Sequence, residues 1–325
     1  MRRVIWYVLL AGIGTVFAEG LSWSTPLVWI SPFVPLIYGL HYALIVDFLL
    51  RRRALTIPAL AVGGLVLGLG TESLMTKVIW NPPWDGAEDM PSILGLRIFA
   101  VFWVCATWHV WMSTAIPLAL AFRSFGHADL LSDRAVRRIL LLLPLTMGMV
   151  VAINQAFPWW AIPAMAANGA GILVLAWLYQ RWGAPSELTM TRAARVMVWI
   201  VLVALYALLL NERPEAWPSV GPLIAGMALL VGSILLFWRV AERDAGAMPG
   251  PGPVRYDGRA LARYLVYFSV MGALSMALAA LLDAVSLVIA VLIIVIVSLV
   301  STVYLLRLAW PNRRIVRLSW RGAGG

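Results

Sequence analysis

Residues 57–80 read IPALAVGGLVLGLGTESLMTKVIW, an apolar run with one carboxylate near its end. A helix that crosses a bilayer needs about 20 apolar residues, so this run is long enough to span. An ionised carboxylate in hydrocarbon is costly unless it is paired, solvated or neutralised. Glu72 therefore predicts a functional site inside a membrane-spanning helix.

The composition extends this pattern to the whole chain, because 62% of the 325 residues are hydrophobic and only 12% are charged. Such a composition is typical of a polytopic membrane protein. We expect an all-α transmembrane helix bundle that forms a single domain over residues 1–325, with about ten spans, or about nine if a short polar break does not separate two of them. The expected spans are residues 4–22, 27–50, 55–80, 93–122, 139–157, 160–180, 195–211, 220–239, 263–282 and 284–306.

Basic residues gather at alternate ends of these spans. Segments 1–3, 51–53, 123–138, 181–195, 239–263 and 307–321 hold every Lys and Arg except Lys77, Arg97 and Arg213. Positive charge is concentrated in the cytoplasmic loops of membrane proteins. We therefore expect both termini in the cytoplasm and the protein in a prokaryotic plasma (inner) membrane. Topology and attraction to anionic lipid head groups then explain the net charge of +10 without a nucleic-acid partner.

The parts of the chain differ in polarity. Residues 1–125 carry the polar motifs, residues 139–325 are more apolar, and residues 241–262 have the Pro- and Gly-rich composition of a flexible cytoplasmic loop. The single cysteine, Cys105, excludes an intrachain disulfide framework. No phosphate-binding loop, nucleophile elbow or zinc-protease motif is present, which disfavours most chemistry of soluble enzymes.

Three ionisable residues lie at similar depths in three different spans. Measured along straight helices from the nearest cytoplasmic arginine, Glu19, Glu72 and His109 are about 24, 28 and 21 Å into the membrane. Gly64, Gly68, Glu72 and Thr76 repeat every four residues and form a small-residue face on which another helix can pack. We therefore expect a polar site that binds a substrate or ion through Glu19, Glu72, His109, Thr76 and Asn154. Glu19, Glu72 and His109 are also candidate metal ligands, and Glu72 and His109 are candidate catalytic residues; mutual satisfaction of these groups without a function is the alternative.

Other polar residues have simpler interpretations. Lys77 and Arg97 lie near the outer interface and are expected to reach the head groups, although Lys77 could pair with Glu72. Asp47 is expected to form an interfacial ion pair with the arginines at 51–53. We expect no cofactor, since a b-type haem would need His41 and His109, and two histidines on two helices are not in themselves a haem pattern. Asn168, with small residues on its helix, is expected to form a close-packed seam.

Five short segments in the first 125 residues resemble a family of uncharacterised prokaryotic polytopic membrane proteins. They are EGLSWSTP at 19–26, YG at 38–39, GTESLMTK at 70–77, NPPW at 81–84 and HVWMSTAIP at 109–117. The chain has Thr71 where that family has the first glutamate of a pair. The order of Glu72 and His109 is also similar to the intramembrane site of the CAAX-prenyl-protease-like superfamily, but the arginine and the second histidine expected of that site are missing.

These observations favour a transporter or permease-like protein with an intramembrane Glu/Glu/His site that binds a small solute or ion. The first alternative is an intramembrane hydrolase in which Glu72 is the general base and His109 the acid or oxyanion stabiliser. The second is a structural or assembly subunit of a membrane complex. The sequence leaves open whether the protein is an enzyme.

Overall fold

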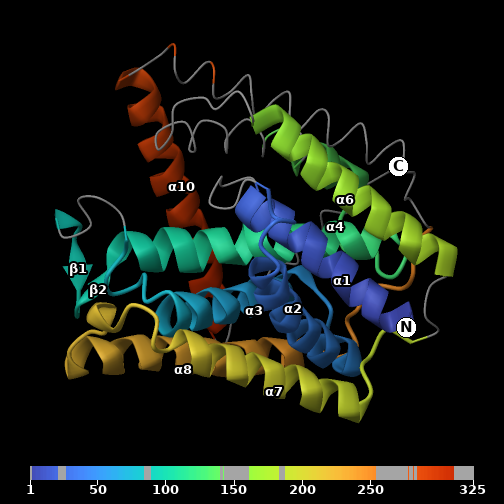
Figure 1. Cartoon of the computed structure of the whole chain (residues 1–325), viewed down its shortest axis with the longest axis horizontal. Coiled ribbons are helices and arrows are strands. Elements are labelled where there is room, and N and C mark those ends of the chain that lie inside the picture. Colours follow the sequence, from blue (N-terminus) through green and yellow to red (C-terminus); the bar gives the residue numbers. More distant parts are fainter. Residues whose placement is uncertain are drawn as a thin grey trace.

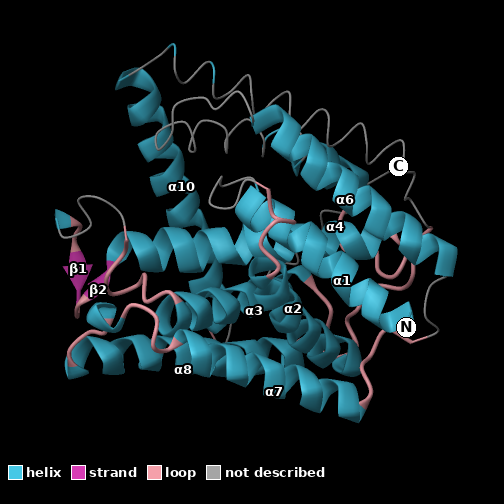
Figure 2. Cartoon of the chain, in the orientation of Figure 1, coloured by secondary structure: helices cyan, strands magenta, loops and turns pink. Residues whose placement is uncertain are grey.

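The computed structural model describes residues 2–20, 27–83, 89–139, 142, 161–182, 187–253, 277, 281 and 284–310, and most of them are helical (Figure 2). Figure 1 labels the α-helices and both strands. In chain order the elements are α1 (Arg2–Thr15), η1 (Val16–Gly20), α2 (Phe33–Arg52), α3 (Ile57–Gly70), η2 (Thr71–Met75), β1 (Ser92–Ile93), β2 (Leu96–Arg97), η4 (Ala100–Ala115), α4 (Ile116–Ser124), α6 (Ala161–Trp182), α7 (Arg192–Leu209), η5 (Pro214–Ala216), α8 (Val220–Arg243) and α10 (Ala284–Ala309).

Seven helices of the described part are long and apolar enough to cross a membrane. They are Arg2–Gly20, Phe33–Arg52, Ile57–Met75, Ala100–Ser124, Arg192–Leu209, Val220–Arg243 and Val288–Ala309. Apart from a few positions, the spans expected at 139–157 and 263–282 lie outside the described residues. The helical membrane architecture is therefore confirmed, while the total of about ten spans and the cytoplasmic position of the termini stay predictions.

Two expected helix starts were wrong. The second span begins at Phe33 rather than at residue 27, because residues 28–30 form a turn, closed by a bond from Ile30 N to Leu27 O at 3.2 Å, and Pro32 precedes the helix. The fourth begins near residue 98 rather than 93, because β1 and β2 form a short antiparallel hairpin. Its turn has Leu94 and Gly95 at φ +54° and +75°, the left-handed region that favours glycine.

The helices α3 and η4 lie at the centre of the bundle. Figure 1 shows α3 between η4 and α8, with α1 crossing toward α6 and α2 beside α7, and the contacts agree with this arrangement. Within the most apolar windows of α3–η2 and η4–α4, 72% and 78% of residues are buried, against 6%, 11% and 17% in α7, α8 and α10. The three outer helices thus expose apolar side chains, such as Trp199 and Leu235, on surfaces suited to lipid.

Three helical segments, η1, η2 and η4, have π-helical hydrogen bonding, in which a residue bonds to the fifth residue before it. The backbone N–H of Thr76 donates to Thr71 O at 3.0 Å, and the backbone N–H of Ile116 donates to Trp111 O at the end of η4. π-Helical turns are rare and occur frequently at functional sites. Glu19, Glu72 and His109 each lie in one of these three segments.

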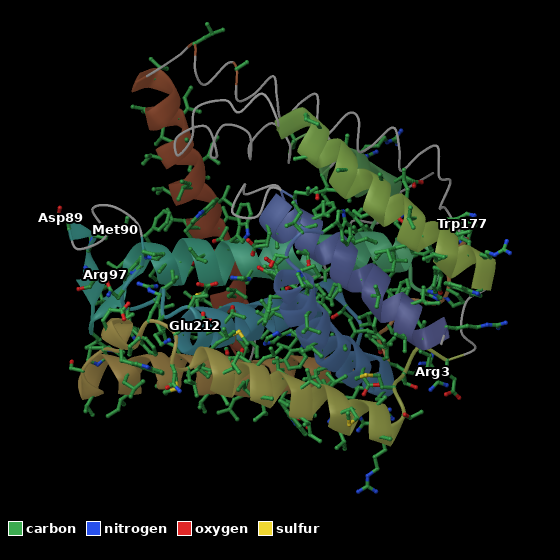
Figure 3. All side chains as sticks on the ribbon, viewed as in Figure 1. Arg3, Asp89, Met90, Arg97, Trp177 and Glu212 are labelled. Atoms are coloured by element: carbon green, nitrogen blue, oxygen red, sulfur yellow. The ribbon has the colours of Figure 1, made fainter. Side chains whose placement is uncertain are left out.

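The arginine-bearing ends of α1, α2 and α7 lie close together, and Figure 3 labels Arg3 there. Asp47 is only 1% exposed and pairs with Arg51 at 2.9 Å and Arg195 at 3.0 Å. It also accepts a hydrogen bond from the backbone N–H of Met190 at 2.6 Å. The predicted ion pair of Asp47 is confirmed, and the structure adds that it joins α2 to the start of α7.

The segment expected to be a flexible loop from residue 241 begins later and is bound to α2 at its start. α8 continues to Arg243, and the backbone N–H groups of Gly246 and Met248 donate to Arg52 O at 3.1 Å and Arg53 O at 2.8 Å. These bonds satisfy carbonyl groups at the C-terminal end of α2, which have no partner inside the helix. The remainder of the predicted loop, from residue 254, lies outside the described residues.

Candidate functional site

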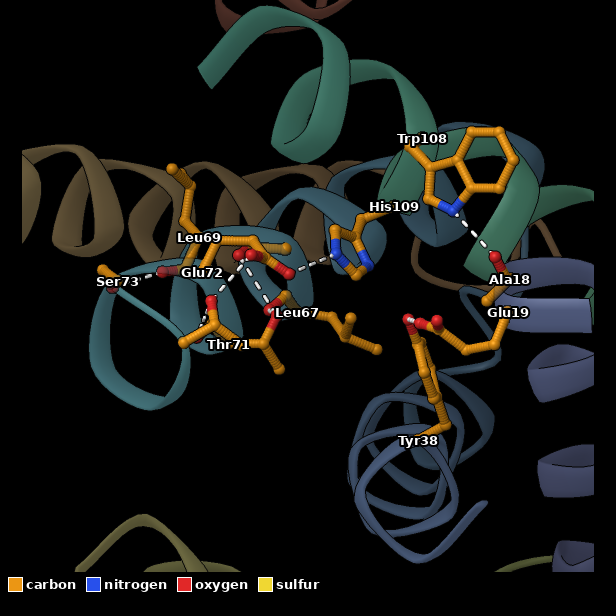
Figure 4. Close-up of polar contacts among 12 residues, drawn as sticks. Ala18, Glu19, Tyr38, Leu67, Leu69, Thr71, Glu72, Ser73, Trp108 and His109 are labelled. Atoms are coloured by element: carbon orange, nitrogen blue, oxygen red, sulfur yellow. Dashed lines mark hydrogen bonds and ion pairs between the residues drawn. The ribbon is translucent and has the colours of Figure 1, made fainter. Parts of the chain in front are cut away.

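Glu72 on η2 and His109 on η4 meet inside the bundle. Glu72 Oε1 lies 3.0 Å from His109 Nε2, and the two residues are 9% and 3% exposed (Figure 4). Gly68 makes this approach possible, because a Cβ atom at that position would lie 2.7 Å from His109 Cβ. The small-residue face predicted on this helix therefore faces η4, and it places the carboxylate against the imidazole.

Thr76 completes the surroundings of the Glu72 carboxylate. Its hydroxyl donates to Glu72 Oε2 at 2.7 Å, so each carboxylate oxygen has a protein partner. A donor on each oxygen fixes the orientation of a carboxylate. Glu72 is thus held in place by one residue from its own segment and one from η4.

Glu19 joins the same region through Tyr38. The Tyr38 hydroxyl donates to Glu19 Oε1 at 2.6 Å, and the Tyr38 ring stacks on the His109 ring with centroids 6.1 Å apart. Trp108, next to His109, donates from Nε1 to Ala18 O at 3.0 Å, which ties η4 to η1 (Figure 4). The structure therefore brings Glu19, Glu72, Thr76 and His109 into one polar cluster, and it adds Tyr38.

One nitrogen of the cluster has no partner among the residues that the structure describes. His109 Nδ1 is buried and makes no hydrogen bond with them, although Nε2 is engaged by Glu72. If Glu72 is ionised, Nε2 carries the ring proton and Nδ1 is an acceptor; this tautomer is inferred from the hydrogen bonding. A buried acceptor without a donor costs free energy, and such groups in native proteins call for an explanation.

The two basic residues nearest in sequence turn away from the cluster. Lys77 is fully buried, and its amine donates to Leu209 O at 3.3 Å and to Glu212 O at the end of α7, so it neither reaches head groups nor pairs with Glu72. Burial lowers the pKa of the Lys77 amine, and the positive charge of Arg213 lowers it further. Arg97 donates to Met90 O at 2.8 Å, at the hairpin end of the bundle (Figure 3).

His41 and Tyr206 form a second polar pair, on α2 and α7. His41 Nε2 lies 3.0 Å from the Tyr206 hydroxyl, and Nδ1 lies 2.8 Å from Ile37 O. Both ring nitrogens of His41 are thus engaged, and in this arrangement neither is open to a haem iron. Tyr206 was not predicted as a site residue. Its one counterpart in the sequence is Gly70, a small residue that lets the Tyr206 hydroxyl approach the helix, since a Cβ atom there would lie 2.8 Å from that hydroxyl.

The remaining residues that were predicted to form the site or a helix seam lie elsewhere. Asn154 lies outside the described residues. Asn168 is buried on α6 and accepts a hydrogen bond from Val28 N at 3.2 Å, and a Cβ atom on Gly171 would meet the Trp29 ring at 2.3 Å, as a close-packed seam requires. Among the residues that the structure describes, no group of three His, Cys, Asp or Glu side chains is arranged to hold a metal ion. The metal role of Glu19, Glu72 and His109 stays a prediction.

Comparison with known proteins gives a family but no activity. No solved structure matches the chain. An uncharacterized protein of Archaeoglobus fulgidus is 30% identical over 138 residues, which is 41% of this chain and 42% of that relative, so the match spans less than half the length of either protein. A model described as "Uncharacterized membrane protein family" matches residues 8–317, far beyond the first 125 residues that suggested a resemblance. The chain therefore belongs to this family of uncharacterised membrane proteins.

Proposed function

We propose that this protein is a proton-coupled transporter and that Glu72 and His109 carry the proton. The observation that supports this most directly is the contact of 3.0 Å between two ionisable side chains that are both buried within spans. Ionisable residues in such positions are rare and mark ion pathways and proton relays in pumps and transporters.

The charge of the pair explains how a proton could be coupled to a second species. With Glu72 ionised and His109 neutral, the pair carries one negative charge in a region of low dielectric constant. A proton on His109 Nδ1 makes the pair neutral, and a bound cation would compensate the same charge. The pair carries one negative charge, so binding a proton and a cation together would leave it with a net positive charge. We therefore expect the proton and the cation to bind one at a time. That exclusion is the basis of an exchange mechanism.

The donors around the carboxylate prepare it for this role. Thr76 holds Oε2, and His109 is fixed on its other side by the stacked ring of Tyr38. A fixed carboxylate needs little reorganisation when the proton arrives or leaves. Lys77, which would neutralise the pair permanently, is instead directed at the carbonyl groups of α7.

The second candidate function is acid–base catalysis on a substrate dissolved in the membrane. The unpartnered Nδ1 of His109 favours it, because a histidine whose other nitrogen is held by a carboxylate is the arrangement of a general base. In that case His109 would abstract the proton and Glu72 would orient it. This reverses the roles suggested by the similarity to CAAX-prenyl-protease-like proteins, since both Glu72 oxygens already accept hydrogen bonds.

Proton flux into liposomes that contain the purified protein tests the proposal. A trapped pH indicator would report flux driven by an imposed membrane potential, with monovalent cations on the opposite side. We expect Glu72→Gln and His109→Gln to reduce flux to the level of empty liposomes while the protein keeps its helical content. Glu187→Gln is the matched control, because Glu187 is exposed and pairs with Arg3 at the arginine-rich end.

Three other outcomes would each reject the proton-carrying role. Undiminished flux in Glu72→Gln would remove the pair from the pathway. No flux in the wild-type protein, together with turnover of a lipid-borne substrate that requires His109, would favour the enzyme. No flux and a loss of stability alone in both variants would favour a structural or assembly subunit.

A further inference from the structure

Arg52, the last residue of α2, carries a positive charge that forms no ion pair with a carboxylate of the described residues. Asp47, which the sequence suggested as a partner for the arginines at 51–53, pairs with Arg51 and Arg195 instead. A guanidinium has five N–H donors in a planar array. In Arg52, none of them is committed to a carboxylate in the part of the chain that the structure describes.

Two aromatic rings fix the position of this guanidinium. Arg52 Cζ lies 3.8 Å from the centroid of the Phe48 ring and 4.7 Å from that of the Trp238 ring on α8. The two rings contact each other with centroids 5.4 Å apart, so they form one support that joins α2 to α8. A guanidinium over aromatic rings keeps the N–H groups that recognise a phosphate or carboxylate. Arg52 is thus held in place by rings rather than by a protein anion.

An exposed apolar stripe on α8 leads to the same place. Val231, Ile234, Leu235 and Trp238 are spaced by three or four residues, which puts them on one face of the helix. Their side chains are 45–65% exposed. Because α8 is long and apolar enough to cross a membrane, this face suits the acyl chains of lipids. The stripe ends at the ring that supports Arg52, so a hydrocarbon surface is continuous with a positive charge.

The other arginines near the ends of α2 and α8 add positive charge. Arg53 and Arg239 are both exposed, and neither forms an ion pair with a carboxylate that the structure describes. Arg243 and Asp244 pair with each other at 2.8 Å, so their charges compensate. An anion at Arg52 would therefore lie in a region of net positive charge.

Glu242 acts against such a ligand. The Trp238 indole N–H donates to its carboxylate, which places one negative charge beside the two rings. Glu242 forms no ion pair with Arg52, so it lowers the affinity for an anion without occupying the guanidinium. Its neutralisation should therefore have the opposite effect from the loss of Arg52.

We propose that Arg52, Phe48 and Trp238 form a binding site for an anionic phospholipid. Phosphate oxygens of the head group accept hydrogen bonds from the Arg52 guanidinium, and an acyl chain lies along the exposed stripe of α8. A zwitterionic lipid binds more weakly, because its own ammonium group compensates the phosphate charge. The site shares no residue with the Glu72–His109 cluster, and it does not depend on the proposed function.

Native mass spectrometry of the full chain, released from detergent micelles, tests the site with two lipids that have the same acyl chains. They are dioleoylphosphatidylglycerol, which is anionic, and dioleoylphosphatidylcholine, which is zwitterionic. We expect the first molecule of the anionic lipid to bind at least roughly tenfold more tightly, the ratio expected for one hydrogen bond to a charged group. Glycerol phosphate, which has the phosphate without acyl chains, should not displace this lipid at equal concentration.

Variants then locate the binding. Arg52→Gln should lower the affinity for phosphatidylglycerol roughly tenfold, and Trp238→Leu should lower it less, since an apolar side chain stays on the stripe. Glu242→Gln should raise the affinity. Arg192→Gln is the matched control and should bind like wild type. Arg192 is exposed at the start of α7 and lies over no aromatic ring of the described residues, so the variant removes the same charge without touching the site.

Equal affinity for the two lipids or unchanged binding in Arg52→Gln would overturn the proposal. An equal loss in Arg192→Gln would do the same, because it would show attraction to surface charge in general. Displacement by glycerol phosphate would show that the acyl chain does not hold the ligand, and the lipid would then be wrong. A thermal unfolding scan separates lost binding from lost structure. If Arg52→Gln does not fold, the opposite changes expected in Trp238→Leu and Glu242→Gln still decide, and weaker or unchanged binding in Glu242→Gln would contradict the site.

Discussion

Replacing Gly68 by alanine tests the geometry on which the site depends. The added Cβ atom would lie 2.7 Å from His109 Cβ and 3.0 Å from both Cγ and Cδ2. Carbon atoms in ordinary contact are about 3.5–4.0 Å apart, so the imidazole must retreat by roughly 1 Å from α3. Glu72 stands on the continuation of the same helix, and the contact of 3.0 Å from its Oε1 to His109 Nε2 would open beyond hydrogen-bond range.

The expected cost follows from these displacements. Overpacking costs about 1–3 kcal/mol and loss of a hydrogen bond to a charged group about 1.5–3 kcal/mol, while alanine gains about 1 kcal/mol of helix propensity over glycine. The free energy of unfolding should therefore fall by about 1.5–5 kcal/mol. Reversible denaturation in mixed micelles measures this change, and the proton-flux assay should show a parallel loss of coupling.

Gly232 supplies the matched control for this substitution. It lies in α8, and a Cβ atom there would meet nothing within 4 Å. Gly232→Ala should leave stability within about 1 kcal/mol of wild type, or raise it slightly. If Gly68→Ala behaves like Gly232→Ala in stability and flux, α3 and η4 do not approach as closely as described, and the reasoning about the Glu72–His109 pair is refuted.

Four further substitutions test the two ends of the bundle. Asp47→Asn leaves Arg51 and Arg195 without their shared carboxylate. Because both arginines are partly exposed, the free energy of unfolding should fall by only about 1–3 kcal/mol in the same denaturation assay. Glu187→Gln breaks an exposed pair and should cost less than about 1 kcal/mol. Lys77→Met removes the donor to two carbonyl groups at the end of α7 and should increase proteolysis of the α7–α8 turn; unchanged cleavage would show that the amine does not hold that turn. Burial lowers the pKa of His127 from 6.5 to about 4. Between these pKa values the unfolded chain binds a proton that the folded chain does not. The stability contributed by His127 should therefore be fully present above pH 6.5 and decline as the pH falls toward 4. In thermal scans between pH 7 and about 4.5, His127→Gln should reduce this decline.

The pairing of Glu72 with His109 was within reach of the sequence. Gly68 and Gly64 stand one and two turns before Glu72, and a helix packed tightly on glycines places a neighbouring residue against the next side chain on that face. Depth along the helix then selected His109 among the polar residues of the fourth span. Helical rise and small-residue spacing are properties of a single segment, and for that reason they are visible in one sequence.

The π-helical turns and the direction of Lys77 were not predictable in the same way. The spacing of polar residues along a helix could distinguish a π-helix from an α-helix, but an apolar span has no such polar face. The sequence of residues 100–115 therefore does not predict that η4 is π-helical. Lys77 has a φ of +60°, which turns its side chain off the helix toward α7. That direction depends on carbonyl groups 132 and 135 residues away, at Leu209 and Glu212, and a local pattern contains no information about them.

The same long-range contacts connect the site to the outer helices. Thr76 holds Glu72 through its hydroxyl, while its carbonyl accepts a hydrogen bond of 2.9 Å from Arg213 in the turn between α7 and α8. Lys77, the next residue, reaches back to the end of α7, so the two turns bind each other reciprocally. Because α7 and α8 have few buried residues, they can shift at lower cost than α3 or η4. A shift of their turn would move Thr76, whose hydroxyl holds the Glu72 carboxylate. Under the proposed function, the position of the outer helices would therefore affect the Glu72–His109 pair.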